Sequence, residues 1–322
     1  MKKRRTLTAS TLLLFLAMAL VRTSSAEDVI GQKAVLVTGA SSGIGRNIAE
    51  RLAAEGHFVY AGARKPADIA ALSTLKNVQG IRLDVTVQAD IDAAVEAISA
   101  AGRGLHGIVN NAGVIVVAPM AETEEADLAF LFDVNTFGPY RITKAFTPLL
   151  IESGGRISNI SSMAGVASGP AYGAYSMSKH AIEAFTDSLA VEMLEVGVRV
   201  SAIEPGAYRS NGGESYCRRR AERGYDPSKS LFPKLAADIA SLCDNINDNR
   251  YPEPDPVADA VMHALFSSTP RQHYLAAPDQ QQTAYVIRDI LQDLVDLNAG
   301  HPFSYSRDEL VAMLDEVLAA SK

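Results

Sequence analysis

The stretch "KAVLVTGASSGIGR", residues 33–46, decides the fold. Its first six residues form a nearly continuous apolar run, typical of a strand that is covered on both faces. Three glycines follow, Gly39, Gly43 and Gly45, and a helical pattern begins near Ile44. Glycines permit a tight turn there and let the backbone approach a pyrophosphate, whose charge the free amides of the helix N-terminus stabilise. A merely tight turn is the alternative. The position between a first strand and a first helix favours a dinucleotide-binding site.

Outward from this stretch, short apolar runs alternate with amphipathic helical patterns. The further runs expected to be strands span 58–63, 78–84, 107–112, 155–161, 198–204 and 272–277. Helical patterns such as "ADIDAAVEAISAAG" (89–102) separate them. A strand and a helix repeated along the chain predict an α/β fold with helices on both faces of the sheet. We therefore expect a Rossmann-type, doubly wound parallel sheet of about seven strands in a single domain.

The residues after the second expected strand bear on the choice of cofactor. Arg64 and Lys65 follow Ala63, and no carboxylate occurs until Asp68. A site that prefers NAD usually has an acidic side chain there for the ribose 2′-hydroxyl, whereas an arginine suits a 2′-phosphate. The sequence therefore predicts that NADP(H) is preferred, with NAD(H) possible. The alternative is that both cations simply face solvent.

The two ends of the chain differ from this domain. The first 26 residues run from a basic head, "MKKRR", through the apolar residues Leu12–Val21 to small residues, the order of a cleavable export signal. The apolar run is about half of the ~20 residues that cross a bilayer. We expect an exported, periplasmic protein. An uncleaved membrane anchor or a misassigned start, with a cytoplasmic protein, are the alternatives, and only this segment offers membrane association. The dinucleotide-binding domain is expected over 31–280, and a helical C-terminal extension over 281–322.

Charge and cysteine content exclude some classes of function. The formal net charge is −7, and it becomes −12 without residues 1–26, which hold five positive charges and no negative ones. Such an acidic chain is a poor nucleic-acid binder. The only basic cluster, Arg218–Arg220, is expected in a solvated loop. Cys217 and Cys243 lack metal-ligand spacing, so no metal is expected. In an exported protein they can pair as a disulfide, with two buried free thiols as the alternative.

Seven motifs occur in one order along the chain. They are "TGASSGIG" (38–45), "LDV" (83–85), "NNAG" (110–113), Asn135 in "DVNTFG", "NISS" (159–162), Tyr175-x-x-x-Lys179 and "PG" (205–206). With these motifs, the chain resembles the short-chain dehydrogenase/reductase family in its compact form, over residues 31 to 280. "VYAGAR" and "IEPGAYRSN" resemble the branch of the retinol and 17β-hydroxysteroid dehydrogenases. The resemblance implies hydride transfer between a nicotinamide and an alcohol or its carbonyl.

The resemblance also implies a catalytic set of Asn135, Ser162, Tyr175 and Lys179. The family's serine precedes its tyrosine by 13 residues, which selects Tyr175 rather than Tyr172 as the proton donor. Tyr175 and Lys179 share one helix face because they are four residues apart. A free phenol has a pKa near ~10, and a nearby ammonium lowers it. Ser162 would hold the substrate oxygen, and Asn135 a relay water, with a solvent-facing asparagine as the alternative.

The resemblance implies the cofactor-binding residues as well. Asp84 and Val85 would meet the adenine, Lys179 the ribose, and Pro205 with Gly206 the nicotinamide carboxamide. Asn111 has the alternative role of tying strands together. The full set is Thr38, Gly39, Ser41, Ser42, Gly43, Ile44, Gly45, Arg64, Asp84, Val85, Asn111, Ala112, Gly113, Tyr175, Lys179, Pro205 and Gly206. The family's threonine after this last pair is replaced here by Ser210, which puts one cofactor hydrogen bond in doubt.

Residues 208–256 lose the regular alternation, and the family places its substrate lid there. The branch resemblance favours a bulky apolar alcohol or carbonyl as substrate. An acidic or small polar substrate, met by the three arginines, is the alternative. A homodimer or homotetramer is expected through the helices that carry Asn135 and Tyr175. Rival functions are a non-catalytic NADP-binding protein and a dehydratase or epimerase on the same fold.

Overall fold

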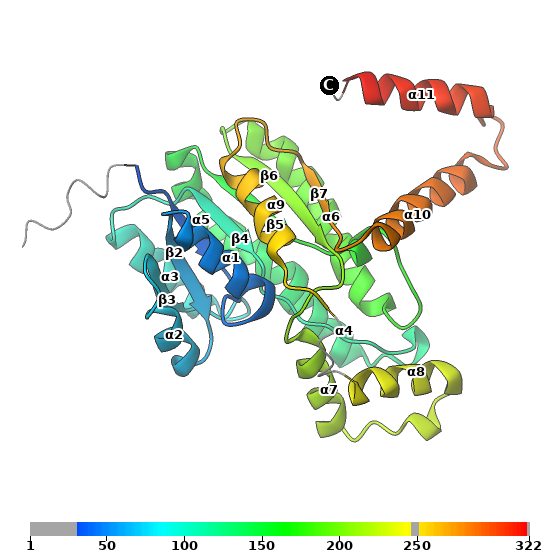
Figure 1. Cartoon of the computed structure of the whole chain (residues 1–322), viewed down its shortest axis with the longest axis horizontal. Coiled ribbons are helices and arrows are strands. Elements are labelled where there is room, and N and C mark those ends of the chain that lie inside the picture. Colours follow the sequence, from blue (N-terminus) through cyan, green and yellow to red (C-terminus); the bar gives the residue numbers. More distant parts are fainter. Residues whose placement is uncertain (1–30, 246–250, 321–322) are drawn as a thin grey trace, which may run out of the picture. The chain divides into compact units, whose positions relative to one another are not determined.

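A single parallel sheet organises the chain in the computed structural model, which describes residues 31–245 and 251–320 (Figure 1). Its strands are β1 (Ala34–Val37), β2 (Phe58–Ala63), β3 (Val78–Arg82), β4 (Gly107–Asn110), β5 (Arg156–Ile160), β6 (Arg199–Pro205) and β7 (His273–Ala276). Their spatial order is β3-β2-β1-β4-β5-β6-β7. The predicted Rossmann-type α/β fold with seven strands is confirmed. The proposed export signal, residues 1–26, lies outside the described residues.

Helices cover both faces of this sheet. On one face lie α1 (Gly43–Ala54) and α9 (Asp255–Phe266), with α2 (Pro66–Leu72) beside them. On the other face lie α3 (Gln88–Ala100), α5 (Gly138–Ser153) and α6 (Gly173–Leu194). Strand β1 contributes side chains to the cores on both faces of the sheet. Val35 and Val37 pack in the core with α1 and α9, and Ala34 and Leu36 pack in the core with α3 and α5. Alternating side chains that are buried on both faces explain why the run is apolar throughout.

A buried polar network ties the central strands to α5 and to α6, the helix that carries Tyr175 and Lys179. The Asn110 side-chain amide donates to Asn159 Oδ1 (2.8 Å) and to Thr143 Oγ1 of α5 (3.2 Å). The Asn159 amide donates in turn to Thr186 Oγ1 of α6 (2.9 Å). Asn110, Asn159, Thr143 and Thr186 are all buried. Because buried polar groups need partners, the network fixes the position of α5 and α6 relative to β4 and β5.

The expected lid contains α7 (Gly212–Glu222), the short 3₁₀ turn η5 (Pro227–Lys229) and α8 (Pro233–Asp244). A disulfide between Cys217 and Cys243 joins α7 to α8. The interpretation of Arg218–Arg220 as a solvated loop is wrong, because these residues lie on α7. Arg219 Nη2 donates to the Ile115 carbonyl (2.7 Å), and Arg220 Nη1 to the Tyr216 hydroxyl (3.2 Å). Arg219 therefore attaches the lid to the body, whereas the Arg220 bond lies within α7.

Two helices follow β7, α10 (Gln280–Asn298) and α11 (Arg307–Ala320). Both expose many large apolar side chains, among them Ile290, Leu291, Leu294, Leu314 and Val317. Their termini are defined by local hydrogen bonds: Asp279 Oδ1 accepts from Gln282 N at the start of α10, and Glu309 accepts from Ser306 before α11. Within residues 31–245 and 251–320, no helix combines the length and the apolar character needed to span a membrane.

Replacing Asn159 by alanine tests the buried network. Asn110 and Thr186 each lose a hydrogen-bond partner and a cavity forms, so we expect the free energy of unfolding to fall by about 3 kcal/mol. Urea unfolding followed by circular dichroism measures the change. Ser158→Ala is the matched control, because Ser158 is equally buried on β5 and its hydroxyl has no partner within the described chain. Equal losses in the two variants would contradict the role of the network.

Candidate active site

The glycine loop between β1 and α1 packs directly on the chain that follows β4. Gly39 has a φ of +65°, and a Cβ there would lie 2.8 Å from Ala112 Cα. A Cβ at Gly45 would lie 2.3 Å from Asn111 Nδ2. Helix α1 begins at Gly43, after Ser42 in an extended conformation. The loop therefore needs glycine at these positions, and it presents a helix N-terminus at the carboxyl end of the sheet.

Thr38 and Asn111 tie this loop to the end of β4. The Thr38 hydroxyl accepts hydrogen bonds from the backbone N–H groups of Asn111 and Ala112, each at 3.0 Å. The Asn111 amide donates to the carbonyls of Thr38 (2.9 Å) and Gly39 (3.2 Å). Both side chains thus join β1 to β4, which is the alternative role expected for Asn111. The sheet order reverses at this pair of strands, where doubly wound folds bind their ligands.

The residues predicted to meet the ribose and adenine lie together at the ends of β2 and β3. Arg64 Nη1 lies 3.8 Å from Asp84 Oδ2, and the Arg64 side chain is 65% exposed. The other oxygen of Asp84 accepts from the backbone N–H and the hydroxyl of Thr86. Val85 is buried, and a Cβ at Gly138 would lie 2.7 Å from its Cγ2. Ser41, Ser42 and Ile44 complete the rim on the glycine loop and the first turn of α1.

Ser162, Tyr175 and Lys179 converge around the carboxyl end of β5. Ser162 follows this strand and caps the short turn η4 (Met163–Gly165), with its Oγ accepting from Ala164 N (3.1 Å). Lys179 on α6 is only 5% exposed, and its Nζ donates to the Ile160 carbonyl (2.8 Å). The same ammonium lies 5.8 Å from the centre of the Tyr175 ring. Ser162 also acts on the Tyr175 hydroxyl, because it lowers the pKa of that phenol.

Burial shifts the titration of both groups on α6. Burial of its hydroxyl raises the pKa of Tyr175 to about 12, opposed in part by the Ser162 side chain. Burial also lowers the pKa of Lys179 to about 8, opposed by the charge of Glu183. At neutral pH the phenol is therefore protonated and most of the lysine is charged. This is the protonation state in which the phenol can donate a proton beside a cation.

Asn135 lies in a π-helical segment, η3 (Asp133–Phe137), between α4 (Glu125–Phe132) and α5. It is 1% exposed, so the solvent-facing alternative is wrong. Its Oδ1 accepts from Val114 N (2.8 Å), and its amide donates to Val114 O (2.9 Å) and Ser178 Oγ (3.0 Å). A Cβ at Gly113 would lie 3.5 Å from Asn135 Oδ1 and 3.8 Å from Lys179 Nζ. Asn135 thus reaches the same region as the lysine, and its relay water stays a prediction.

The loop after β6 completes the site with a residue that the sequence did not reveal. Gly206 N donates to Ala276 O (2.9 Å), and Ala207 N to Oε1 of Gln282 on α10 (2.8 Å). A Cβ at Gly206 would lie 2.6 Å from the same oxygen. Gln282 is 75 residues from Ala207 along the chain, so no local signal indicated it. Ser210 approaches the glycine loop, because a Cβ at Gly43 would lie 3.1 Å from Ser210 Cα.

An apolar cluster from the body and the lid lies against Tyr175. Its buried members are Val116, Val117, Leu131, Ala171, Ala174, Tyr216 and Ile239. Tyr172 and Tyr175 are partly buried and pack against it, as do the two disulfide cysteines. Tyr216 also donates a hydrogen bond to the Val117 carbonyl, which attaches α7 to this wall. The side of the site next to the predicted proton donor is therefore apolar.

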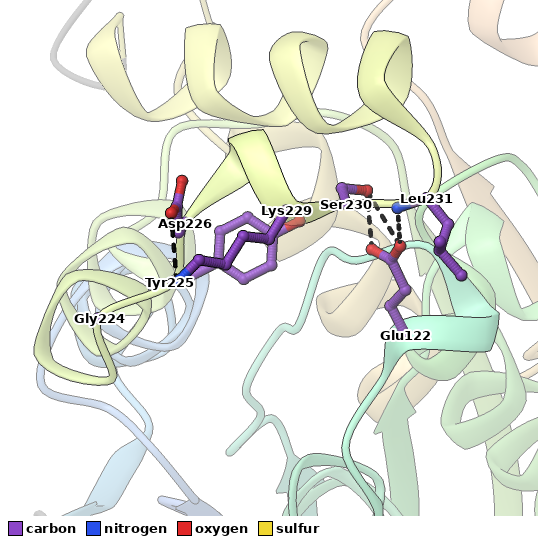
Figure 2. A pocket seen from close by; sticks show the side chains of 7 residues that line it. All are labelled: Glu122, Gly224, Tyr225, Asp226, Lys229, Ser230 and Leu231. Carbon is purple, nitrogen blue, oxygen red and sulfur yellow. Dashed lines mark hydrogen bonds and ion pairs between the residues drawn. The ribbon is translucent and has the colours of Figure 1, made fainter.

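A separate pocket of about 360 Å³ lies between the lid and Glu122 of the body. Figure 2 shows the residues that line it. It is lined by Glu122, Gly224, Tyr225, Asp226, Lys229, Ser230 and Leu231. The Glu122 carboxylate, on the turn η2 (Met120–Glu122), accepts from Ser230 Oγ (2.8 Å) and from Leu231 N (2.5 Å). The carboxylate therefore joins the lid to the body. None of these lining residues, all within the described chain, belongs to the predicted site.

A family model for the short chain dehydrogenases matches residues 33–220. The chain belongs to this family. The mitochondrial D-beta-hydroxybutyrate dehydrogenase of Bos taurus is 33% identical to this short-chain dehydrogenase, over 77% of each chain. Retinol dehydrogenase 7 of Mus musculus is 34% identical, over 77% of this chain and 81% of its own. A crystal structure of a short-chain dehydrogenase/reductase from Burkholderia phymatum in complex with NAD superposes with a TM-score of 0.70 and 26% identity, over 85% and 98% of the two chains.

This short-chain dehydrogenase is therefore an oxidoreductase, as its motifs predicted, from a family that uses a nicotinamide cofactor with small-molecule substrates. Its own residues fit such a cofactor. The glycine loop leaves no room for side chains at Gly39 and Gly45, and it opens onto the N-terminus of α1. A helix N-terminus at this edge of the sheet is a ready site for a pyrophosphate.

Gly39→Ala tests the close approach in the glycine loop. The variant places a Cβ 2.8 Å from Ala112 Cα, so the loop must shift, and we expect NADPH and NADH to bind at least about tenfold more weakly. Titration of the fluorescence of bound NADPH and NADH measures the change. Gly104→Ala is the matched control, because Gly104 has a φ of +69° and open space around it. It bears the same backbone strain of about 1 kcal/mol without the clash. Equal affinities in the two variants would contradict this account.

Proposed function

We propose that this short-chain dehydrogenase is an NADP(H)-preferring alcohol dehydrogenase or carbonyl reductase with a bulky, apolar substrate. The observation that carries the proposal is the convergence of Ser162, Tyr175 and Lys179 at the end of β5, beside an apolar cluster. This arrangement supports proton transfer to a carbonyl oxygen beside an apolar wall. It favours catalysis over the rival role of a non-catalytic NADP-binding protein.

The residues of the chain then divide the work as follows. The Tyr175 hydroxyl gives its proton to the substrate oxygen while the carbonyl carbon is reduced, and the product is an alcohol. The Lys179 ammonium stabilises the phenolate that remains. The Ser162 hydroxyl donates a hydrogen bond to the same substrate oxygen and stabilises charge there in the transition state. When bound, the nicotinamide supplies the hydride, and the reverse reaction returns it.

The contacts of the lid arginines support the apolar substrate over the acidic one. The Arg219 guanidinium donates to Ile115 O and lies 4.6 Å from the centre of the Phe130 ring. The Arg220 guanidinium lies 3.8 Å from the centre of the Tyr225 ring. Two of the three arginines are thus engaged by the protein itself. The relatives' names include both retinol, an apolar alcohol, and D-beta-hydroxybutyrate, a small hydroxy acid, which keeps the acidic substrate as the second candidate.

Arg64 supports the preference for NADP(H). It follows the last residue of β2, the position where NAD-specific sites usually have an acidic residue that binds the ribose 2′-hydroxyl, and its side chain lies beside Asp84. We expect Arg64→Ala to lower kcat/KM with NADPH by about tenfold, since it removes one charge-assisted contact worth about 1.4 kcal/mol, and to change kcat/KM with NADH little. Initial rates with the two cofactors measure the ratio. Lys65→Ala is the control for a general loss of positive charge, and an equal loss with both cofactors would contradict the role of Arg64.

We propose further that the protein is exported and forms a homodimer or homotetramer. The Cys217–Cys243 disulfide supports an oxidising compartment such as the periplasm. Exposed apolar side chains on the helices next to the site support self-association, namely Phe137, Tyr140, Ile151, Met177, Val191 and Leu194. Residues 1–26 would direct the export and would then be removed by cleavage after Ala26.

The decisive test follows NADPH and NADH oxidation by protein without residues 1–26, with a panel of retinoid and steroid carbonyls, simple ketones and 3-oxo acids. We expect Tyr175→Phe to lower kcat by at least about 10³-fold with the best substrate, because the proton donor is lost. Tyr172→Phe is the control, since Tyr172 packs against the same cluster beside Tyr175. Activity that survives in Tyr175→Phe would exclude Tyr175 as the acid. NADPH binding without turnover of any carbonyl would favour the non-catalytic function.

A further inference from the structure

Behind the predicted catalytic residues lies a second cluster of titratable side chains. Glu183 on α6, Glu204 on β6 and His273 on β7 bring their polar atoms within 4.8 Å of one another. His273 Nδ1 lies 2.9 Å from Glu204 Oε1 and 3.6 Å from Glu183 Oε2, and its Nε2 lies 2.9 Å from Asp187 Oδ1. The two glutamate side chains are only 12% and 3% exposed. No step of the reaction described above uses them.

The protonated side chain of His273 is the cation of this cluster. Both of its nitrogens face carboxylates, so both N–H groups of an imidazolium have acceptors. The carboxylates of Glu183, an ion-pair partner at 3.6 Å, and of Glu204, a hydrogen-bond partner at 2.9 Å, raise the pKa of His273 to about 10, against the effect of burial. Because this value lies well above neutrality, the imidazolium persists through the neutral range. Burial raises the pKa of Glu204, and the bond to His273 opposes that rise.

Glu183 connects this cluster to Lys179. The two residues are one helical turn apart on α6, so their side chains share a face. A Cβ at Gly165 would lie 3.0 Å from Glu183 Oε1 and 3.1 Å from the Lys179 carbonyl carbon, which places both residues against the same turn η4. Within the described chain, neither Glu183 oxygen has a hydrogen-bond partner. Lys179 Nζ is bonded there to the Ile160 carbonyl, which carries no full charge.

The carboxylates at this end of the sheet outnumber the cation of the cluster. Two buried carboxylates, Glu183 and Glu204, and the half-exposed Asp187 surround His273, so a second cation, Lys179, can be matched by a carboxylate here. A buried charge without a counter-charge is costly, so the lysine needs a carboxylate in its surroundings. The other groups near its ammonium are Tyr175 on the same helix and Asn135 from η3, and neither is an anion at neutral pH. Glu183 is the carboxylate that acts on its charge.

We propose that Glu183 is a positioning residue for the reaction. Its carboxylate, held by the His273 imidazolium, keeps the Lys179 ammonium charged beside Tyr175. The inference rests on the proposed function, because that function gives Tyr175 and Lys179 their roles. The site then includes Glu183, one helical turn after Lys179 on α6, together with Glu204 on β6 and His273 on β7.

The first test measures the titration of Lys179 and needs no substrate. In protein labelled with ¹³C-lysine, the Cε signal of Lys179, assigned with Lys179→Arg, should titrate near its expected pKa of about 8. In Glu183→Gln the carboxylate is gone while His273 stays positive, so we expect the pKa of Lys179 to fall by about one unit or more. Glu192→Gln is the matched control, an exposed glutamate on the same helix, and it should leave the titration unchanged.

Two further variants separate charge from structure. Glu183→Asp keeps a carboxylate and should restore most of the lysine titration. The double variant Glu183→Gln/His273→Gln also removes the uncompensated imidazolium, so its Lys179 pKa should lie closer to that of the unaltered protein than in Glu183→Gln alone. A merely structural role predicts the opposite, because a second substitution in the same cluster adds damage.

The pH dependence of alcohol oxidation then tests the link to the reaction. Oxidation needs the phenolate of Tyr175, and loss of the neighbouring ammonium raises the pKa of that phenol. In Glu183→Gln the ammonium is lost about one unit lower in pH, so the acidic limb of kcat/KM should level off about one unit lower, at a plateau about tenfold lower than in the unaltered protein. An unchanged limb, with a shifted Lys179 titration, would overturn the catalytic part of the inference.

Other results overturn the inference directly. A Lys179 titration unchanged in Glu183→Gln would do so, and so would Zn²⁺ that raises the melting temperature of EDTA-treated protein but not of His273→Gln, since neutral imidazole and metal would then fill the cluster. Failure of the proposed function is distinguishable. If the unaltered protein turns over no carbonyl or alcohol, the Lys179 titration still decides whether Glu183 sets the charge of the lysine.

Discussion

The buried ammonium of Lys179 is the constraint on which the catalytic half of the molecule depends. A charge at this depth is stable only with hydrogen-bond acceptors and counter-charge fixed nearby. The first is the Ile160 carbonyl at the end of β5, which ties α6 to the central sheet. The second comes from Glu183 and reaches His273 on β7. The hydrogen bonds of Asn110, Asn159 and Thr186 fix α6 against the sheet in the position that allows both contacts of Lys179.

The cofactor half depends on a different constraint, which is close backbone approach. The side chains of Thr38 and Asn111 hydrogen-bond the end of β1 to the residues after β4, and this brings the glycine loop into close contact with Ala112. Those bonds fix the loop without occupying the N-terminus of α1. The rim residues Arg64 and Asp84 form a loose ion pair at 3.8 Å, which contributes little to stability and leaves the 65% exposed Arg64 side chain accessible. The glycine loop is thus fixed by buried hydrogen bonds, whereas the rim at Arg64 is held only by a weak ion pair.

The sequence predicted what depends on local pattern. The strands and the fold class followed from apolar runs, because strands buried on both faces must be apolar. The motif spacings gave the family, and the structure brings Ser162, Tyr175 and Lys179 together. Contacts between distant segments were not predictable: Gln282 reaches Ala207 from another helix, and Arg219 turns inward to a carbonyl instead of facing solvent. One missed signal was present. Glu204 is a carboxylate inside an apolar strand pattern, and such a residue requires a buried partner.

The disulfide between α7 and α8 has a consequence for turnover. A covalent link between the two lid helices, 26 residues apart in sequence, means that the lid cannot admit substrate by fraying one helix at a time. A movement of the two helices as one unit would break the contacts of Arg219 with Ile115, Tyr216 with Val117, and Arg223 with Asp127 together. If product release needs that movement, its barrier limits kcat whenever the chemical step at Tyr175 is faster.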